Sequence, residues 1–269
     1  MDCRPIGVFD SGLGGLTTLK ELKKLLPGED IIYLGDTGRV PYGLKSKETI
    51  IKYALQDAAF LAGFDIKAMV VACNSVCCSA YDVLIEKCSI PIYEVITPAV
   101  KAAAFRSKNK KIGVIGTKAT IRSGAYKAAL EAALPGCKIL SAACPLFVPL
   151  VEEGITEPDD TAALSIAERY LSPLRESGID TLILACTHYP LLKNVISKVV
   201  GKDIALIDSG METAKLTATD LSGKRAHGNE KAEGEIKYFV TDSTDGFAEM
   251  ASKFLGSDIR GMIKQVELE

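Results

Sequence analysis

Two cysteines directly follow short apolar runs that are typical of buried strands. Cys73 follows AMVVA, and Cys186 follows TLILA. Hydrogen-bonding residues come next in both places: Asn74 with Ser75, and Thr187 with His188. Such groups beside a thiol lower its pKa, most of all where a helix begins. The pattern therefore predicts a pair of catalytic cysteines.

Other roles for these thiols have to be weighed. A cysteine is often only a small buried apolar residue, and packing can account for the other six: Cys3, Cys77, Cys78, Cys88, Cys137 and Cys144. Structural zinc needs four grouped ligands, and the chain has only two histidines, His188 and His227. We therefore expect no metal. Two alternatives stay open: a Cys-His acyl-transfer enzyme using Cys186 and His188, and a two-lobed binding protein without chemistry.

A glycine-rich turn, FDSGLGGL at residues 9–16, places Asp10 at the end of another expected strand. Gly12 and Gly14 begin a dinucleotide fingerprint, but Thr17 stands where its third glycine belongs. No G-K-[ST] phosphate loop occurs either. We therefore expect no nucleotide cofactor. The exposed backbone N–H groups of such a turn suit a carboxylate instead.

Two more segments carry candidate side chains. The turn-rich stretch GDTGRVPYG at 35–43 could place the backbone and hydroxyl donors of Tyr42 and Gly43 over a substrate, or be a solvated loop. The stretch CPLFVPLVEEG at 144–154 contains Glu152, which could tune a histidine or an ammonium group, or lie on the surface. Spacing alone does not decide either case.

Length and charge limit the class of protein. The chain has 269 residues and a formal charge of −2, from 32 basic and 34 acidic residues. This balance gives no excess of positive charge that would bind nucleic acid or an anionic membrane, so a small molecule is the expected partner. No stretch reaches the roughly 18 apolar residues of a membrane span, and no signal sequence is visible. We expect a cytoplasmic protein with free thiols.

The apolar periodicity predicts an α/β fold with largely parallel sheets. We expect strands at 5–9, 30–34, 67–72, 91–96, 111–115, 137–142, 180–185, 204–207 and 236–240. We expect helices at 16–26, 47–62, 76–87, 98–107, 119–134, 159–176, 191–200, 211–221 and 245–255.

Two pairs of similar short segments predict two similar α/β domains. IGVFDS at 6–11 resembles IGVIGT at 112–117, and VVAC at 70–73 resembles ILAC at 183–186. We place the domains at residues 1–95 with 208–269, and at residues 96–207. Ligands of open α/β sheets gather beyond the carboxyl ends of the strands. Two facing halves would therefore put one cysteine on each side of a shared cleft.

Several stretches, in order along nearly the whole chain, carry a family resemblance: FDSGLGGLT, YLGDTGRVPYG, VVACNS, PAVKAA, IGVIGTKATIRSGAY, CPLFVPLVEEG, ACTHYPLL and LIDSGMETA. Together they resemble glutamate racemases of the aspartate/glutamate racemase superfamily. The resemblance implies an isomerase that needs no cofactor, interconverts L- and D-glutamate, and supplies D-glutamate for peptidoglycan in cell wall biogenesis. We also expect a homodimer. Aspartate racemase and one-cysteine decarboxylases or isomerases are the alternatives within the superfamily.

The resemblance also implies roles for individual residues. Cys73 would take the α-proton from D-glutamate and Cys186 from L-glutamate. Three residues would assist them: Asp10, Glu152 and His188. The implied substrate contacts are Asp10, Ser11, Tyr42, Gly43, Asn74, Ser75, Thr117, Thr120, Thr187 and His188.

One stretch departs from the family pattern. The family reads C-N-T-A-S-A after the first cysteine, whereas this chain reads CNSVCC at 73–78. Ser75 stands where threonine is expected, and serine keeps the hydroxyl while losing a methyl group. Substrate binding should therefore survive. Cys77 and Cys78 are expected to be packing residues on the following helix.

Overall fold

The computed structural model describes residues 2–223 and 233–268, within which the strands form two separate parallel sheets. His227 lies outside the described residues. Every strand pair in both sheets is parallel. The expected α/β fold with largely parallel sheets is therefore confirmed.

The first sheet has the strand order β10-β9-β2-β1-β3-β4. Its strands are β1 (Ile6–Asp10), β2 (Ile31–Gly35), β3 (Ala68–Val71), β4 (Ile92–Tyr93), β9 (Ile236–Val240) and β10 (Ile263–Gln265). Its helices are α1 (Leu16–Leu25), α2 (Lys47–Ala62), α3 (Asn74–Lys87) and α11 (Thr244–Leu255), with the short 3-10 turns η1 (Thr37–Arg39) and η2 (Tyr42–Leu44).

The second sheet has the order β6-β5-β7-β8. Its strands are β5 (Lys111–Gly116), β6 (Lys138–Ala143), β7 (Thr181–Ala185) and β8 (Ala205–Asp208). The surrounding helices are α4 (Ile96–Arg106), α5 (Lys118–Ser123), α6 (Ala125–Ala133), α7 (Phe147–Glu152), α8 (Thr161–Glu176) and α9 (Lys193–Val200), with the 3-10 turn η3 (Tyr189–Leu192). Helix α10 (Ser209–Gly223) follows β8.

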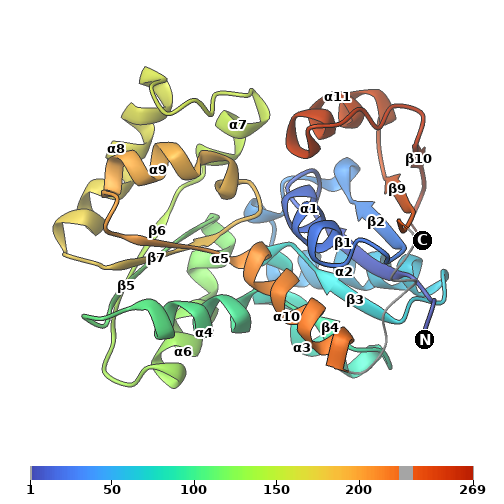
Figure 1. Ribbon diagram of the computed structural model, residues 1–269, viewed down its shortest axis with the longest axis horizontal. Coiled ribbons are helices and arrows are strands. Elements are labelled where there is room, and N and C mark those ends of the chain that lie inside the picture. Colours follow the sequence, from blue (N-terminus) through green and yellow to red (C-terminus); the bar gives the residue numbers. More distant parts are fainter. Residues whose placement is uncertain (1, 224–232, 269) are drawn as a thin grey trace.

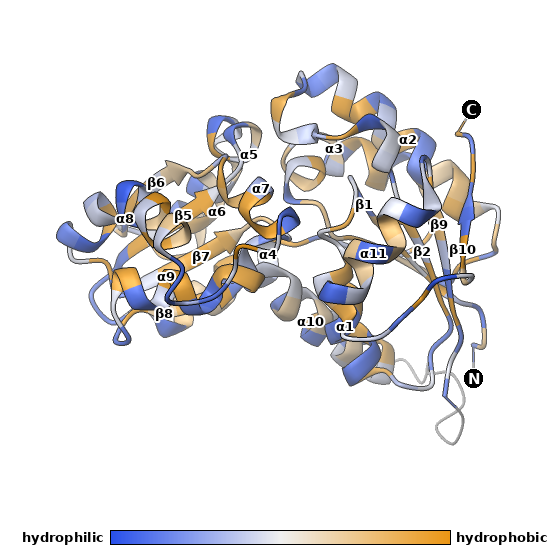
Figure 2. Ribbon diagram, turned by 90° about the horizontal axis from the view of Figure 1, so that it is seen from above, coloured by the Kyte–Doolittle hydropathy of each residue, from blue (hydrophilic) through white to orange (hydrophobic). Residues whose placement is uncertain are grey.

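Helices cover both faces of each sheet, which is why the central strands β1, β2, β3 and β7 are continuous buried runs. In the first sheet, Val8 packs in the core on the side of α1 and α10, while Phe9 packs on the side of α2 and α3. In the second sheet, Leu184 faces α8 and α9, while Ile183 faces α4 and α6. The apolar residues are concentrated along these strands and the helix faces against them (Figure 2).

The two sheets occupy two lobes that the chain joins through α4 and α10 (Figure 1). Helix α10 packs against α1 of the first lobe and α4 of the second. After α10 the chain returns to the first lobe, where β9 and β10 complete the sheet and α11 lies between them in the sequence. Strand membership does not define a folding unit, so the boundaries near residues 95 and 207 stay a prediction.

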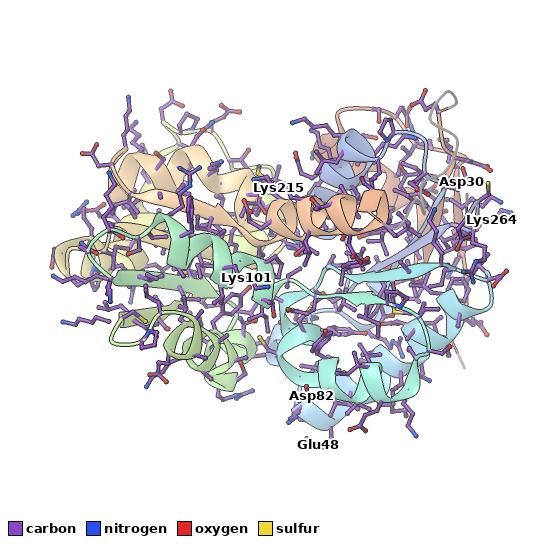
Figure 3. All side chains as sticks on the ribbon, turned by 60° about the horizontal axis from the view of Figure 1, so that its bottom comes forward. Asp30, Glu48, Asp82, Lys101, Lys215 and Lys264 are labelled. Atoms are coloured by element: carbon purple, nitrogen blue, oxygen red, sulfur yellow. The ribbon has the colours of Figure 1, made fainter. Side chains whose placement is uncertain are left out.

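Charged side chains lie on the outside of both lobes. Asp30, Glu48, Asp82, Lys101, Lys215 and Lys264 are all exposed and point away from the ribbon (Figure 3). Within the described ranges, no helix is long and apolar enough to cross a membrane. None of the eight cysteines, all of which lie in these ranges, forms a disulfide.

The elements differ from the sequence prediction in a few places. The helix expected at 119–134 is two helices, because Gly124 between α5 and α6 has a left-handed φ of 70°. That conformation is easy for glycine and ends a helix. The expected strand at 91–96 is only two residues long. Strand β10 and helix α7 were not expected, since both are short.

Candidate active site

A cavity of about 370 Å³ lies between the two lobes, beyond the carboxyl ends of the central strands. Residues of both lobes line it, including Ser11 after β1, Cys73 after β3, Thr117 after β5 and Cys186 after β7. Because parallel strands direct their carboxyl ends to one edge, residues distant in sequence meet here. The volume suits a small-molecule ligand.

Cys73 is the N-cap residue of α3 and is 6% exposed. Its Sγ donates a hydrogen bond to Oγ of Ser11 at 3.4 Å. Burial, and after it the nearby charge of Asp10, raise the pKa of this thiol to about 12, against hydrogen bonds that lower it. The sequence predicted a lowered pKa from the helix start. That prediction is wrong, because loss of water around the thiolate outweighs the local donors.

Cys186 follows β7 in the second lobe, lines the same cavity and is 5% exposed. Burial is the largest cause of a raised pKa here too. A backbone hydrogen bond from His188 opposes that effect, while the charges of Cys73 and Asp10 add to it. The ionisation of Cys73 therefore affects Cys186, as expected for two thiols that line one cavity.

Asp10 lies directly behind the cavity wall and is fully buried. Its carboxylate accepts hydrogen bonds from the Gly12 backbone at 3.0 Å and from Oγ1 of Thr187 at 3.4 Å. Burial raises the pKa of Asp10, and the charge of His188 lowers it. A carboxylate from the first lobe thus binds a hydroxyl beside Cys186 in the second lobe.

Gly14 allows this close contact between the lobes. A Cβ added to Gly14 would lie 2.1 Å from Oγ1 of Thr187 and 2.5 Å from Nδ1 of His188. Neither distance is compatible with a side chain, so the glycine turn serves the meeting of the lobes as well as the start of α1.

His188 is 7% exposed and pairs with Glu152 at the end of α7. The Nε2 atom of His188 lies 3.2 Å from Oε1 of Glu152. The Nδ1 atom has no hydrogen-bond partner within the described residues. Glu152 lines the central cavity, whereas Glu153 lines a neighbouring one. Of the two adjacent carboxylates, Glu152 is therefore the one that meets the histidine.

Tyr42 is 1% exposed, and its hydroxyl is already bound. It donates to Oδ2 of Asp36 and lies 3.3 Å from Oδ2 of Asp57. Arg39 pairs with both carboxylates, at 2.6 Å and 2.9 Å. The hydroxyl that the sequence offered as a substrate donor therefore holds the loop instead, and backbone groups are what this loop can present.

Hydroxyl groups from both lobes meet at the floor of the cavity. Oγ of Ser75 lies 3.0 Å from Oγ1 of Thr117, and 3.5 Å from Oγ1 of Thr120. Thr117 is also the N-cap of α5, where it accepts from the Thr120 backbone at 3.2 Å. Ser75 thus contacts the second lobe through its hydroxyl, the group that a threonine at this position would also have.

Most of the predicted site residues come together. Those that line the cavity are Ser11, Tyr42, Gly43, Cys73, Asn74, Ser75, Thr117, Glu152, Cys186, Thr187 and His188. Asp10 and Thr120 do not line it. Asp10 contacts the lining residue Thr187, and Thr120 contacts the lining residue Ser75.

The structure adds residues that the sequence reasoning missed. Lys118, at the start of α5, lines the cavity. Its place between Thr117 and Thr120 was the available signal. Leu13, Val40, Val148 and Pro149 form an apolar wall. Across the described ranges, no three His, Cys, Asp or Glu residues group to hold a metal ion.

A two-lobed α/β fold with one thiol from each lobe in a shared cavity defines a class of acid–base enzymes acting on small molecules. Residues 11–217 match the family described as Asp/Glu/Hydantoin racemase. The chain belongs to this family, and the resemblance found in the sequence is thereby confirmed. It is an amino-acid racemase fold.

Known relatives cover the whole chain. It is 48% identical over 269 residues to a glutamate racemase of Geobacter metallireducens, covering 100% of this chain and 98% of that protein. A crystal structure of a Bacillus anthracis glutamate racemase isoform superposes with a TM-score of 0.94 at 39% identity, covering 100% of this chain and 99% of that one. The crystal structure of a Francisella tularensis glutamate racemase in complex with D-glutamate superposes with a TM-score of 0.92 at 38% identity, with the same coverage.

Proposed function

We propose that this protein interconverts L- and D-glutamate by a two-base mechanism in which Cys73 and Cys186 exchange protons with Cα. Inversion requires a base on one face of the planar carbanion and an acid on the other. The observation that carries the proposal is a thiol from each lobe lining one cavity. Cys73 acts as the base toward D-glutamate and Cys186 toward L-glutamate.

The raised pKa values set what the neighbouring groups must do. With a pKa of about 12, the Cys73 thiol is protonated at neutral pH, and its ionisation costs roughly 4 kcal/mol more than at the reference value of 9.0. Asp10, whose own pKa is raised, acts as the proton partner of Cys73. The pair of His188 and Glu152 serves Cys186. The substrate ammonium group adds a positive charge that favours a thiolate.

Fixed donors in the cavity stabilise the negative charge that develops on the substrate. The backbone N–H of Gly43 and the hydroxyl of Ser75 are candidates for this, while the Gly12 N–H and the Thr187 hydroxyl are bound to Asp10. Lys118, which also lines the cavity, is a candidate cation for a substrate carboxylate. The apolar wall lowers the local dielectric constant, which strengthens each interaction. We propose that no cofactor takes part.

The test is the racemisation of L-glutamate by Cys73→Ala and Cys186→Ala, followed by circular dichroism. Each variant should lose about 10²- to 10⁴-fold in kcat, because a positioned general acid or base contributes this much. Cys88→Ala, a half-buried cysteine outside the cavity, is the matched control. Far-UV spectra check the fold.

Full activity of either cavity variant would remove the two-thiol mechanism. Wild-type protein that racemises L-aspartate in preference to L-glutamate would change the substrate. A covalent acyl-enzyme in the mass spectrum would favour the acyl-transfer alternative.

We also propose the wider setting that the family resemblance implies: a cytoplasmic homodimer that supplies D-glutamate for peptidoglycan. The free thiols fit a reducing compartment. Light scattering of the purified protein would test the homodimer, with a single species of 28.7 kDa contradicting it.

A further inference from the structure

A chain of buried hydrogen bonds runs behind the cavity from one lobe to the other. The hydroxyl of Tyr126 donates to Oδ1 of Asn74 at 2.6 Å. Nδ2 of Asn74 donates to Oγ of Ser209 at 3.3 Å. Oγ of Ser209 in turn donates to the carbonyl of Leu184 at 3.0 Å.

The chain connects the elements that carry the two thiols. Asn74 is the first residue of α3 and directly follows Cys73. Leu184 lies in β7, two residues before Cys186. Tyr126 comes from α6, and Ser209 begins α10, the helix that packs against both lobes.

The direction of each bond is fixed by the groups that can donate. A carbonyl oxygen cannot donate, so the Ser209 hydroxyl must donate its one hydrogen to the Leu184 carbonyl. Ser209 can then only accept from Asn74, which must present its NH₂ group there and its carbonyl oxygen to Tyr126. Asn74, Tyr126 and Ser209 are 2–3% exposed, so water does not replace a lost partner.

This arrangement leaves little of the Asn74 side chain for a substrate. Its carbonyl oxygen and one amide hydrogen are bound within the protein. The side chain is therefore held in one orientation, and the backbone that joins it to Cys73 is held with it.

We propose that Tyr126 and Ser209 are positioning residues that set the separation and orientation of the Cys73 and Cys186 thiols. The inference rests on the two-thiol mechanism proposed above. A proton moves to or from Cα only over a short, aligned distance, and a displacement of about 1 Å costs on the order of 10²-fold in rate. Neither residue lines the cavity, so neither touches the reacting atoms.

The test uses Tyr126→Phe, Ser209→Ala and the double variant, assayed in both directions with folded protein measured by calorimetry. Each single variant should lose about 10- to 100-fold in kcat per folded molecule, with KM changed less than about threefold. Because both act through Asn74, the double variant should lose little more than the worse single variant.

The matched control is Thr217→Val. Thr217 is also a buried hydroxyl on α10, but it donates only to the Thr213 carbonyl of its own helix, at 2.9 Å. It should keep wild-type kcat. Two results would overturn the inference: kcat values in the test variants equal to that of Thr217→Val, or losses that add in full. Wild-type protein without racemase activity would instead overturn the proposed function.

Discussion

At the scale of single residues, burial dominates the chemistry of the two thiols. The N-terminus of α3 and the hydroxyl of Ser11 favour a thiolate at Cys73, yet the pKa is raised to about 12 because the thiolate would lose its water. The pKa of Cys186 is raised for the same main reason, which is burial. Both sulfurs are therefore thiols in the free protein at neutral pH, and the reactive thiolate forms with help from neighbouring groups and substrate.

This state predicts slow alkylation of Cys73 at neutral pH. Iodoacetamide reacts with the thiolate. As long as the pH is below the pKa of a thiol, its thiolate fraction rises about tenfold for each unit by which the pH increases. Peptide mass spectrometry should show Cys73 reacting far more slowly than the exposed Cys3 at pH 7, and accelerating steeply toward pH 10. Equal rates for both cysteines at pH 7 would argue against a buried, protonated thiol.

At the scale of elements, the turn η2 and the start of α5 bring the two lobes into contact at the cavity. Gly43 of η2 lies against the side chain of Thr117, the N-cap of α5. A Cβ on Gly43 would lie 2.9 Å from Cβ of Thr117, too close for two carbon atoms. The β-branched Thr117 has little rotamer freedom to give way. A glycine at this position lets the Tyr42 loop reach the opposite lobe.

Gly43→Ala should therefore displace the Tyr42 loop from the cavity. We expect a loss of about tenfold or more in kcat/KM, since catalysis depends on closely held geometry, with only a small change in Tm. Gly246→Ala in α11 is the control, because its nearest neighbour would be 3.9 Å from the new Cβ. A Gly43→Ala enzyme with the kcat/KM of the control would show that this contact does not shape the site.

At the scale of the whole molecule, the site exists only where the two lobes meet. Each lobe contributes one thiol, hydroxyl groups near its strand ends and part of the wall. One continuous apolar core runs from α1 in the first lobe to α8 and α9 in the second, with α10 between them. A ligand that contacts both walls therefore adds contacts between the lobes as well as filling the cavity.

D-glutamate should raise the melting temperature of the Cys73→Ala variant, which cannot turn it over. A ligand at 100 times its Kd stabilises the folded state by about 2.7 kcal/mol, or roughly 5–10 °C for a protein of this size. Differential scanning fluorimetry with glycine as the control ligand checks this. An unchanged Tm up to high millimolar D-glutamate would mean that the cavity does not bind it.

Much of the fold could be predicted from the sequence, because strand and helix patterns depend on local spacing. The expected strands and helices occur close to their predicted ranges, apart from the shortened strand at 91–96, the break at Gly124 and the unpredicted β10 and α7. The three exposed or half-buried residues of β10 carry no apolar alternation, and α7 is a short helix with Pro149 inside it. Such segments are ordered by their neighbours rather than by their own residues.

The sequence by itself determined which residues can do the chemistry: two cysteines at the ends of apolar runs in a parallel α/β chain, where strand ends meet by topology. Only the tertiary structure decided their protonation, the burial of the Tyr42 hydroxyl, and the link from Tyr126 through Asn74 to Ser209. The physical reason is distance along the chain. Spacing fixes neighbours within an element, whereas desolvation and hydrogen bonds between lobes depend on residues 50 to 180 positions apart, which only folding brings together.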